Sequence, residues 1–75
     1  MFCLSKNKTM LIDSKNFRIG KINNTVNVDD EIAGKYAVYV NDEHRMTVCD
    51  TLDEAKLILE AISRVIIEGE EYYEF

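Results

Sequence analysis

Residues that many catalytic and metal sites require are scarce in this chain of 75 residues. It has one histidine, His44, and two cysteines, Cys3 and Cys49, without a CxxC spacing. One imidazole seldom holds a divalent metal without further preset ligands, so His44 with Asp42 and Glu43 is interpreted as a solvated turn and no metal site is expected. The two cysteines are expected to be buried or half-buried free thiols in a reducing compartment.

The chain also lacks a glycine-rich phosphate loop. Its three glycines stand alone, and the stretch IAGKY lacks the first glycine and the final hydroxyl of a nucleotide-binding loop. His44 and Cys49 have opposite parity on the strand predicted there, so we expect them on opposite faces and out of contact. We therefore expect no catalytic residue and no cofactor, and a protein that is not an enzyme.

Adjacent acidic residues are plentiful but indicate no acid–base catalysis. They occur in predicted loops, at Asp29/Asp30, Asp42/Glu43 and Glu70/Glu71. A carboxylate that acts as an acid or base must be buried with a shifted pKa, whereas neighbouring acids in loops repel one another into water.

Long hydrophobic runs are absent as well. No apolar stretch approaches the roughly 18 residues that a membrane span needs, and the opening MFCLSKNK has no long apolar core or cleavage site of a secretory signal. With 47% hydrophobic residues the chain is expected to fold, as one domain over residues 1–75. We expect a cytoplasmic protein that does not enter membranes.

The only long segment with helical spacing is TLDEAKLILEAISRVIIE, residues 51–68. Thr51 is placed as an N-cap with Glu54 three residues later, which predicts a capping box, and Gly69 predicts the C-terminal end. At about 100° per residue, one apolar stripe results. It comprises Leu52, Ala55, Ile58, Leu59, Ile62, Val65 and Ile66, whereas Leu57, Ala61 and Ile67 lie outside it.

The remaining segments have strand patterns. Residues 2–5 and 9–13 predict a hairpin, and residues 17–22 a half-buried strand with a bulge near Gly20. Residues 35–41 are the clearest strand, and residues 45–50 return antiparallel, with Met46 and Val48 on the face opposite Thr47 and Cys49. Together they predict an α+β fold in two layers, a curved antiparallel sheet packed against one C-terminal helix.

Between these strands the pattern is weaker. Asn23 and Asn24 suit a tight turn, residues 25–28 a brief strand, and residues 29–31 an acidic loop that closes at Gly34. Both faces of residues 35–41 carry apolar side chains, so the second face is expected to be covered too. A second subunit could supply that cover, so a homodimer is kept as an alternative to the monomer.

Charge is distributed unevenly along the sequence. Through Val28 the chain carries five basic residues against Asp13, and from Asp29 onward it carries thirteen acidic residues against four basic ones. The net charge of −5 argues against nucleic acid as a partner, because neutralising phosphates drives that binding.

Three stretches, LSKNKTMLID, YAVYV and CDTLDEAKLILEAI, resemble a class of small proteins from Firmicute genomes and their phages. The resemblance spans most of the chain. It implies a strand-rich sheet with one helix and an origin in a phage or mobile element, and it brings no catalytic residues with it.

The acidic, aromatic end of the sequence is the best candidate for binding a protein partner. Aromatic anchors among charges are typical of interfaces, and a contact through Leu57 and Ala61 is a second candidate. The candidate residues are Glu70, Glu71, Tyr72, Tyr73, Glu74, Phe75, Leu57 and Ala61. Alternation in the same segment also allows a last strand with its aromatic residues in the core.

Two functions follow as hypotheses. The first is a non-enzymatic binding protein, such as a phage-encoded modulator of a host protein. The alternative is a dimer that binds a nucleotide-like small ligand through Tyr36, Tyr39 and the basic first hairpin.

Overall fold

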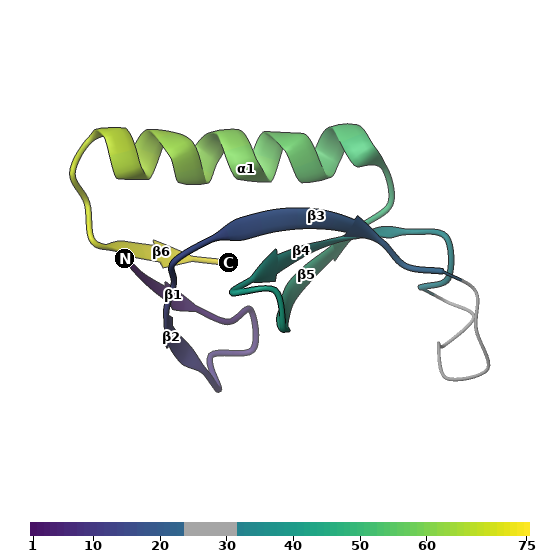
Figure 1. The fold of residues 1–75 in the computed structure, drawn as a ribbon, viewed down its shortest axis with the longest axis horizontal. Helices are drawn as coiled ribbons and strands as arrows, with labels where there is room; N and C mark the ends of the chain where they lie inside the picture. The colour runs from purple at the N-terminus through teal and green to yellow at the C-terminus, as the bar shows by residue number, and fades with distance from the viewer. Residues whose placement is uncertain (24–31) are drawn as a thin grey trace.

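The computed structural model describes residues 1–23 and 32–75 as strands covered by one helix (Figure 1). The elements are β1 (Phe2–Leu4), β2 (Leu11–Asp13), β3 (Phe17–Lys21), β4 (Tyr36–Val40), β5 (His44–Cys49), α1 (Leu52–Ile67) and β6 (Tyr72–Glu74). The predicted α+β class with one C-terminal helix is therefore confirmed. Asn24, the brief strand at 25–28 and the acidic loop at 29–31 lie outside the described residues.

The strands form two small sheets, where the sequence pattern predicted a single one. Sheet A has the order β2-β1-β6 and sheet B the order β3-β4-β5. All pairings are antiparallel except that of β1 with β6, which is parallel. The polar break at Ser14–Asn16 separates β2 from β3, and each strand of sheet A has only three residues.

Helix α1 begins and ends where the sequence predicts. The Thr51 hydroxyl accepts a hydrogen bond from the Glu54 backbone N–H at 3.2 Å, which satisfies one of the free donors of the first turn. Gly69 has φ of +78° and ends the helix, because a residue without Cβ adopts this conformation at little cost.

The inward face of α1 is shorter than the predicted stripe. Ala55 and Ile62 are buried, but Leu52 is 37% exposed and Ile66 is 53% exposed. The helix has 16 residues, or about 24 Å, whereas the five-residue strand β4 spans only about 17 Å. Figure 1 shows α1 running along sheet B and extending at its C-terminal end toward β6, beyond the strands of that sheet.

Two groups of buried side chains form the core. Cys3, Val40 and Met46 join sheet A to sheet B, and Val38, Cys49 and Ala55 join sheet B to the helix. Phe75 packs against both groups. The end of the chain therefore links the two halves of the core.

The bulge lies in a different strand pair from the one predicted. The β3–β4 ladder runs in register through Gly20 and Ala37, so the prediction of a bulge near Gly20 is wrong. The irregularity is in the β4–β5 ladder, at Val38/Tyr39. It breaks alternation in β5, so Met46 and Cys49 are both buried in the core, although the sequence predicted opposite faces for them.

Glycine at position 20 is required by close packing. A Cβ atom there would lie 2.9 Å from the Tyr39 ring and 2.7 Å from an Arg18 guanidinium nitrogen. Arg18 stacks on this ring, with its Cζ 4.2 Å from the centroid, and its Nε donates to Asp42 Oδ1 at 2.9 Å. The Arg18–Tyr39 stack thus covers the part of sheet B where Gly20 leaves space.

Asn41 connects the turn after β4 to the link between the sheets. Its side-chain oxygen accepts from the Lys15 N–H at 2.7 Å, and its side-chain amide donates to the Asp13 carbonyl at 3.1 Å. Its backbone N–H donates to the Asn16 carbonyl at 3.0 Å. Asn41 has φ of +55°, which asparagine tolerates better than most residues.

Candidate interaction surfaces

The outer face of sheet A is apolar. Cys3, Ile12 and Tyr73 pair side by side and face the core. Because side chains alternate along a strand, the intervening residues point away from it. We call the apolar ones the outer patch: Phe2, Leu4, Leu11 and Tyr72.

Pairing brings the outer patch together from both ends of the sequence. Phe2 is opposite Tyr72, and Leu4 is opposite Leu11. Phe2 is 46% exposed, Tyr72 is 47% exposed and Leu11 is 60% exposed. An antiparallel or mixed sheet with one solvated face normally carries polar residues there, so a solvated apolar face is characteristic of an interaction site.

Charged residues border the outer patch. Glu74 lies beside Leu4 on β6, and its carboxylate forms an ion pair with Lys8 Nζ at 3.5 Å. Asp13 lies beside Phe2 on β2, and its carboxylate forms an ion pair with the N-terminal amine at 3.7 Å. Glu71, just before β6, is exposed. The border thus carries three carboxylates against two cationic groups.

The structure divides the predicted acidic, aromatic segment into two sets. The segment forms β6, whose neighbours are tied to β1 by the bonds from Phe2 N–H to the Glu71 carbonyl at 2.7 Å and from Phe75 N–H to the Leu4 carbonyl at 3.1 Å. Tyr73 and Phe75 pack edge to face in the core, with centroids 5.0 Å apart. Tyr72 and the glutamates Glu70, Glu71 and Glu74 are exposed. Only this exposed set can contact a partner without unfolding β6.

The second predicted contact lies on the outward face of α1. Leu57 is 63% exposed, and Ala61 is exposed one turn later. A hollow of about 410 Å³ opens at this face. It is lined by Leu57, Glu60, Ala61, Arg64 and Glu68.

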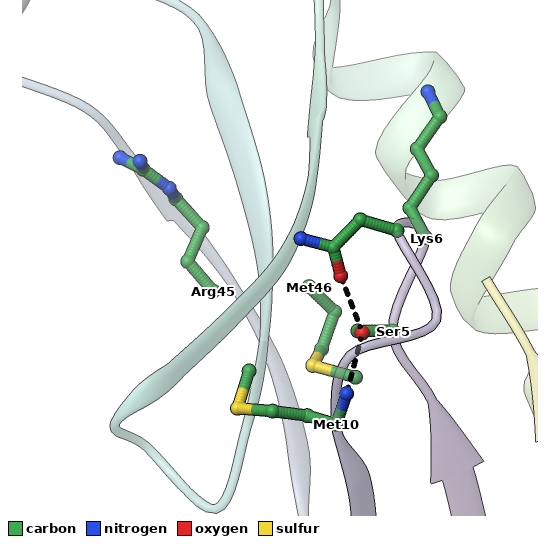
Figure 2. Close-up of a pocket in the computed structure, with 6 residues that line it drawn as sticks. Ser5, Lys6, Met10, Arg45 and Met46 are labelled. Atoms are coloured by element: carbon green, nitrogen blue, oxygen red, sulfur yellow. Dashed lines mark hydrogen bonds between the residues drawn. The ribbon is translucent and has the colours of Figure 1, made fainter.

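A second hollow, of about 320 Å³, lies between the β1–β2 loop and β5 (Figure 2). Its floor includes Met10 and Met46. The Ser5 hydroxyl holds the loop by donating to Asn7 Oδ1 at 2.8 Å and accepting from the Met10 N–H at 3.1 Å.

The cationic side chains beside this hollow do not converge. Figure 2 shows the charged ends of Lys6 and Arg45 on opposite sides of the view, well separated from one another. An anion-binding site needs donors that meet at one point, and these two charged ends do not supply one.

The residues of the small-ligand hypothesis are likewise separated. Tyr36 packs against the buried group that contains Val38, whereas Tyr39 stacks with Arg18 on the opposite face of β4. The two rings therefore do not form one stacking site within a single chain.

Folding also brings the basic and acidic halves of the sequence together. Lys8 pairs with Glu74, and Arg18 pairs with Asp42 at 2.9 Å. The uneven charge along the sequence therefore does not become a simple division of the surface into basic and acidic sides.

Both cysteines are buried free thiols, as predicted. Burial raises the pKa of Cys3, and its hydrogen bond to the Ser14 hydroxyl at 3.5 Å opposes that rise. Burial also raises the pKa of Cys49, with the carboxylates of Glu54 and Asp50 adding to it. Neutral, buried thiols are poor nucleophiles.

His44 does not reach the Cys49 thiol. It pairs with Val40 and Cys49 pairs with Tyr36, two positions that share a face of β4, so the prediction of opposite faces is wrong. The extra residue of the bulge shifts the alternation of side chains in β5 by one position, so His44 and Cys49 point to the same face. Their partners Val40 and Tyr36 are nevertheless four positions apart along β4, about 13 Å at the rise of an extended strand.

Residues 1–23 and 32–75 contain no group of three or more histidine, cysteine or acidic side chains placed to hold a metal ion. Within the same ranges, no helix has the length and hydropathy needed to cross a bilayer. No protein-family model, curated protein or solved structure matches the chain.

The outer patch is the feature that the sequence did not reveal. Composition makes residues 72–74 candidates, but for Phe2 and Leu11 the sequence pattern indicates only a hairpin. Their proximity to Tyr72 depends on the parallel pairing of β1 with β6. The alternation around Cys3, Ile12 and Tyr73 was the available sequence signal, and it required that pairing to be known.

Proposed function

We propose that this protein is a non-enzymatic binding protein of the cytoplasm that uses the outer patch to bind a protein partner. The resemblance to small Firmicute and phage proteins suggests its setting, a phage-encoded modulator that occludes a host protein. The observation that carries the proposal is the solvated apolar face formed by Phe2, Leu4, Leu11 and Tyr72.

Leaving this apolar face in contact with water costs free energy that a partner would recover by covering it. Covering a largely exposed leucine or aromatic side chain contributes on the order of 1–2 kcal/mol, so three such side chains can anchor a specific contact. A sheet this small would be more soluble with polar residues at Phe2, Leu11 and Tyr72, and the fold does not need them inside. A protein partner that covers these three side chains would explain why they are apolar.

The border of the patch suggests the chemistry of that partner. Glu71 and Glu74 flank Tyr72, and Asp13 lies at the other side of the face. A surface with apolar side chains at its centre and lysine or arginine around them would complement this arrangement. The acidic border then governs the rate of association and its salt dependence more than the final affinity.

The separation of His44 from Cys49 supports the non-enzymatic part of the proposal. Cys49 lies beyond hydrogen-bond reach of His44 along the sheet. Both thiols are held neutral by burial. A binding function explains the exposed apolar residues and needs no chemistry from His44, Cys3 or Cys49.

The test compares proteins retained from a Firmicute lysate by the immobilised wild type and by the double variant Leu11→Ser/Tyr72→Ser. The control is Met10→Ser, which removes an apolar side chain of similar exposure, 41%, outside the outer patch. Circular dichroism first establishes that all three chains are folded.

We expect a protein retained by the wild type and by the control but lost with the double variant, and we expect raised salt to weaken its retention. Equal retention by the double variant would exclude the outer patch as the binding surface. Retention of no protein above the level of the bare support would remove the proposed function itself.

A further inference from the structure

The outward face of α1 has the spacing of a helix that packs against another helix. Leu57, Glu60, Arg64 and Ile67 follow one another at intervals of three, four and three residues, the spacing of the a and d positions of a heptad. This line lies opposite the buried Ile62, at about 100° per residue. Leu57 is 63% exposed and Ile67 is 80% exposed.

The hollow on this face has the composition of a packing hole. Leu57, Glu60, Ala61 and Arg64 stand at positions i, i+3, i+4 and i+7, which are the four residues that surround an inserted side chain in helix–helix packing. The small side chain of Ala61 leaves the space open. Across the part of the chain that the structure describes, neither Glu60 nor Arg64 forms an ion pair.

We infer that this face binds a second copy of the chain, with the two α1 helices antiparallel. In the matching register, Arg64 of each copy enters the hollow of the other and meets Glu60, and Leu57 meets Ile67. A two-fold axis creates each contact twice, because an isologous interface pairs the same surface with itself.

Charge selects this orientation. In an antiparallel pair, Glu60 and Arg64 alternate across the interface with opposite signs. In a parallel pair of the same helices, each glutamate would face a glutamate and each arginine an arginine, which is unfavourable. Polar residues at such positions commonly fix register and orientation at some cost in stability.

The size of the helix limits the strength of the dimer. At 16 residues α1 is about 24 Å long and offers little more than two heptads, so the buried area falls at the small end of specific interfaces. We therefore expect reversible association that depends on concentration. Two exposed apolar pairs and two ion pairs provide its stability.

The test is sedimentation equilibrium over a concentration series up to about 1 mM, the weak end of measurable association. The variants are Glu60→Arg, Arg64→Glu and the double exchange Glu60→Arg/Arg64→Glu. Glu43→Arg is the control, because it makes the same charge change at an exposed position of the β4–β5 turn. Each single variant places like charges at two symmetric contacts.

We expect the wild type and Glu43→Arg to dimerise, and each single variant to dissociate at least about tenfold more readily. The double exchange restores opposite charges and should recover the wild-type constant. All variants alter exposed side chains, and circular dichroism verifies that they remain folded.

A wild type that stays monomeric throughout the series would overturn the inference. So would a double exchange no better associated than the single variants, since repulsion between copies would then not explain their defect. These outcomes are independent of the outer patch, because none of the four variants alters it.

Discussion

Replacing Asn41 tests whether one side chain holds the two sheets together. In Asn41→Gly the backbone keeps easy access to the positive φ of +55°, but the bonds to Lys15 N–H and to the Asp13 carbonyl are lost. Each such bond contributes about 0.5–1.5 kcal/mol net, so the expected loss is about 1–3 kcal/mol. Asn41→Ala should lose about 1 kcal/mol more, because alanine is strained at this φ.

These losses are large for a protein of this size. At about 0.05–0.15 kcal/mol per residue, the whole chain is stable by roughly 4 to 11 kcal/mol. A loss of about 1 kcal/mol lowers the Tm of a domain of this length by about 4–8 °C. Urea denaturation and thermal melts followed by circular dichroism can both measure the difference.

The matched control is Asp42→Gly. Asp42 also has positive φ, at +64°, but its side chain makes an exposed ion pair with Arg18 at 2.9 Å. An exposed pair contributes about 0–1 kcal/mol, and relief of backbone strain offsets part of it. If Asn41→Gly is as stable as the wild type, the side-chain bridge between the sheets does not contribute to folding and the reasoning fails.

Two further predictions concern packing and pH. Gly20→Ala should destabilise the protein by about 1–2 kcal/mol in urea denaturation, because the added Cβ would meet the Tyr39 ring at 2.9 Å and an Arg18 guanidinium nitrogen at 2.7 Å. In a Tyr39→Ala background the cost should be smaller, because only the flexible Arg18 side chain then remains to move; an equal cost in both backgrounds would refute the ring contact as the cause. Burial raises the pKa of Cys3 and Cys49 above the ordinary 9.0, so the unfolded chain releases these protons first. The stability from this source is complete below about pH 9 and falls as the pH rises toward the pKa values of the folded state, which thermal melts from pH 7 to 10.5 would detect. Native thiols that react with a disulfide reagent as fast as free cysteine would contradict the burial.

The elements that could be predicted from sequence are those specified by nearby residues. The N-cap at Thr51, the stop at Gly69 and the apolar spacing between them lie within one segment, so α1 follows from local rules. The strand at Tyr36–Val40 was equally clear from its composition. Confirmation of the α+β class depends mainly on these two elements.

What could not be predicted depends on pairing between distant segments. Nothing near Phe2 specifies that β6 will lie parallel beside it, so neither the second sheet nor the outer patch was expected. The bulge at Val38/Tyr39 had the same consequence for β5. The extra residue of the bulge places Met46 in the core together with Cys49, and it places His44 on the same face as Cys49. Strict alternation of side chains along the strand predicts opposite faces for both pairs.

The two proposed surfaces lie on different sides of the fold, and this has a consequence for binding. In Figure 1 the outward face of α1 is directed away from both sheets, and the outer patch belongs to sheet A. A dimer joined through α1 would therefore leave both outer patches free. A partner with repeated binding sites would then engage two patches at once, and the second contact would form at a high effective concentration. Weak association through Glu60 and Arg64 would in this way be sufficient, because the partner itself would bring the two copies together.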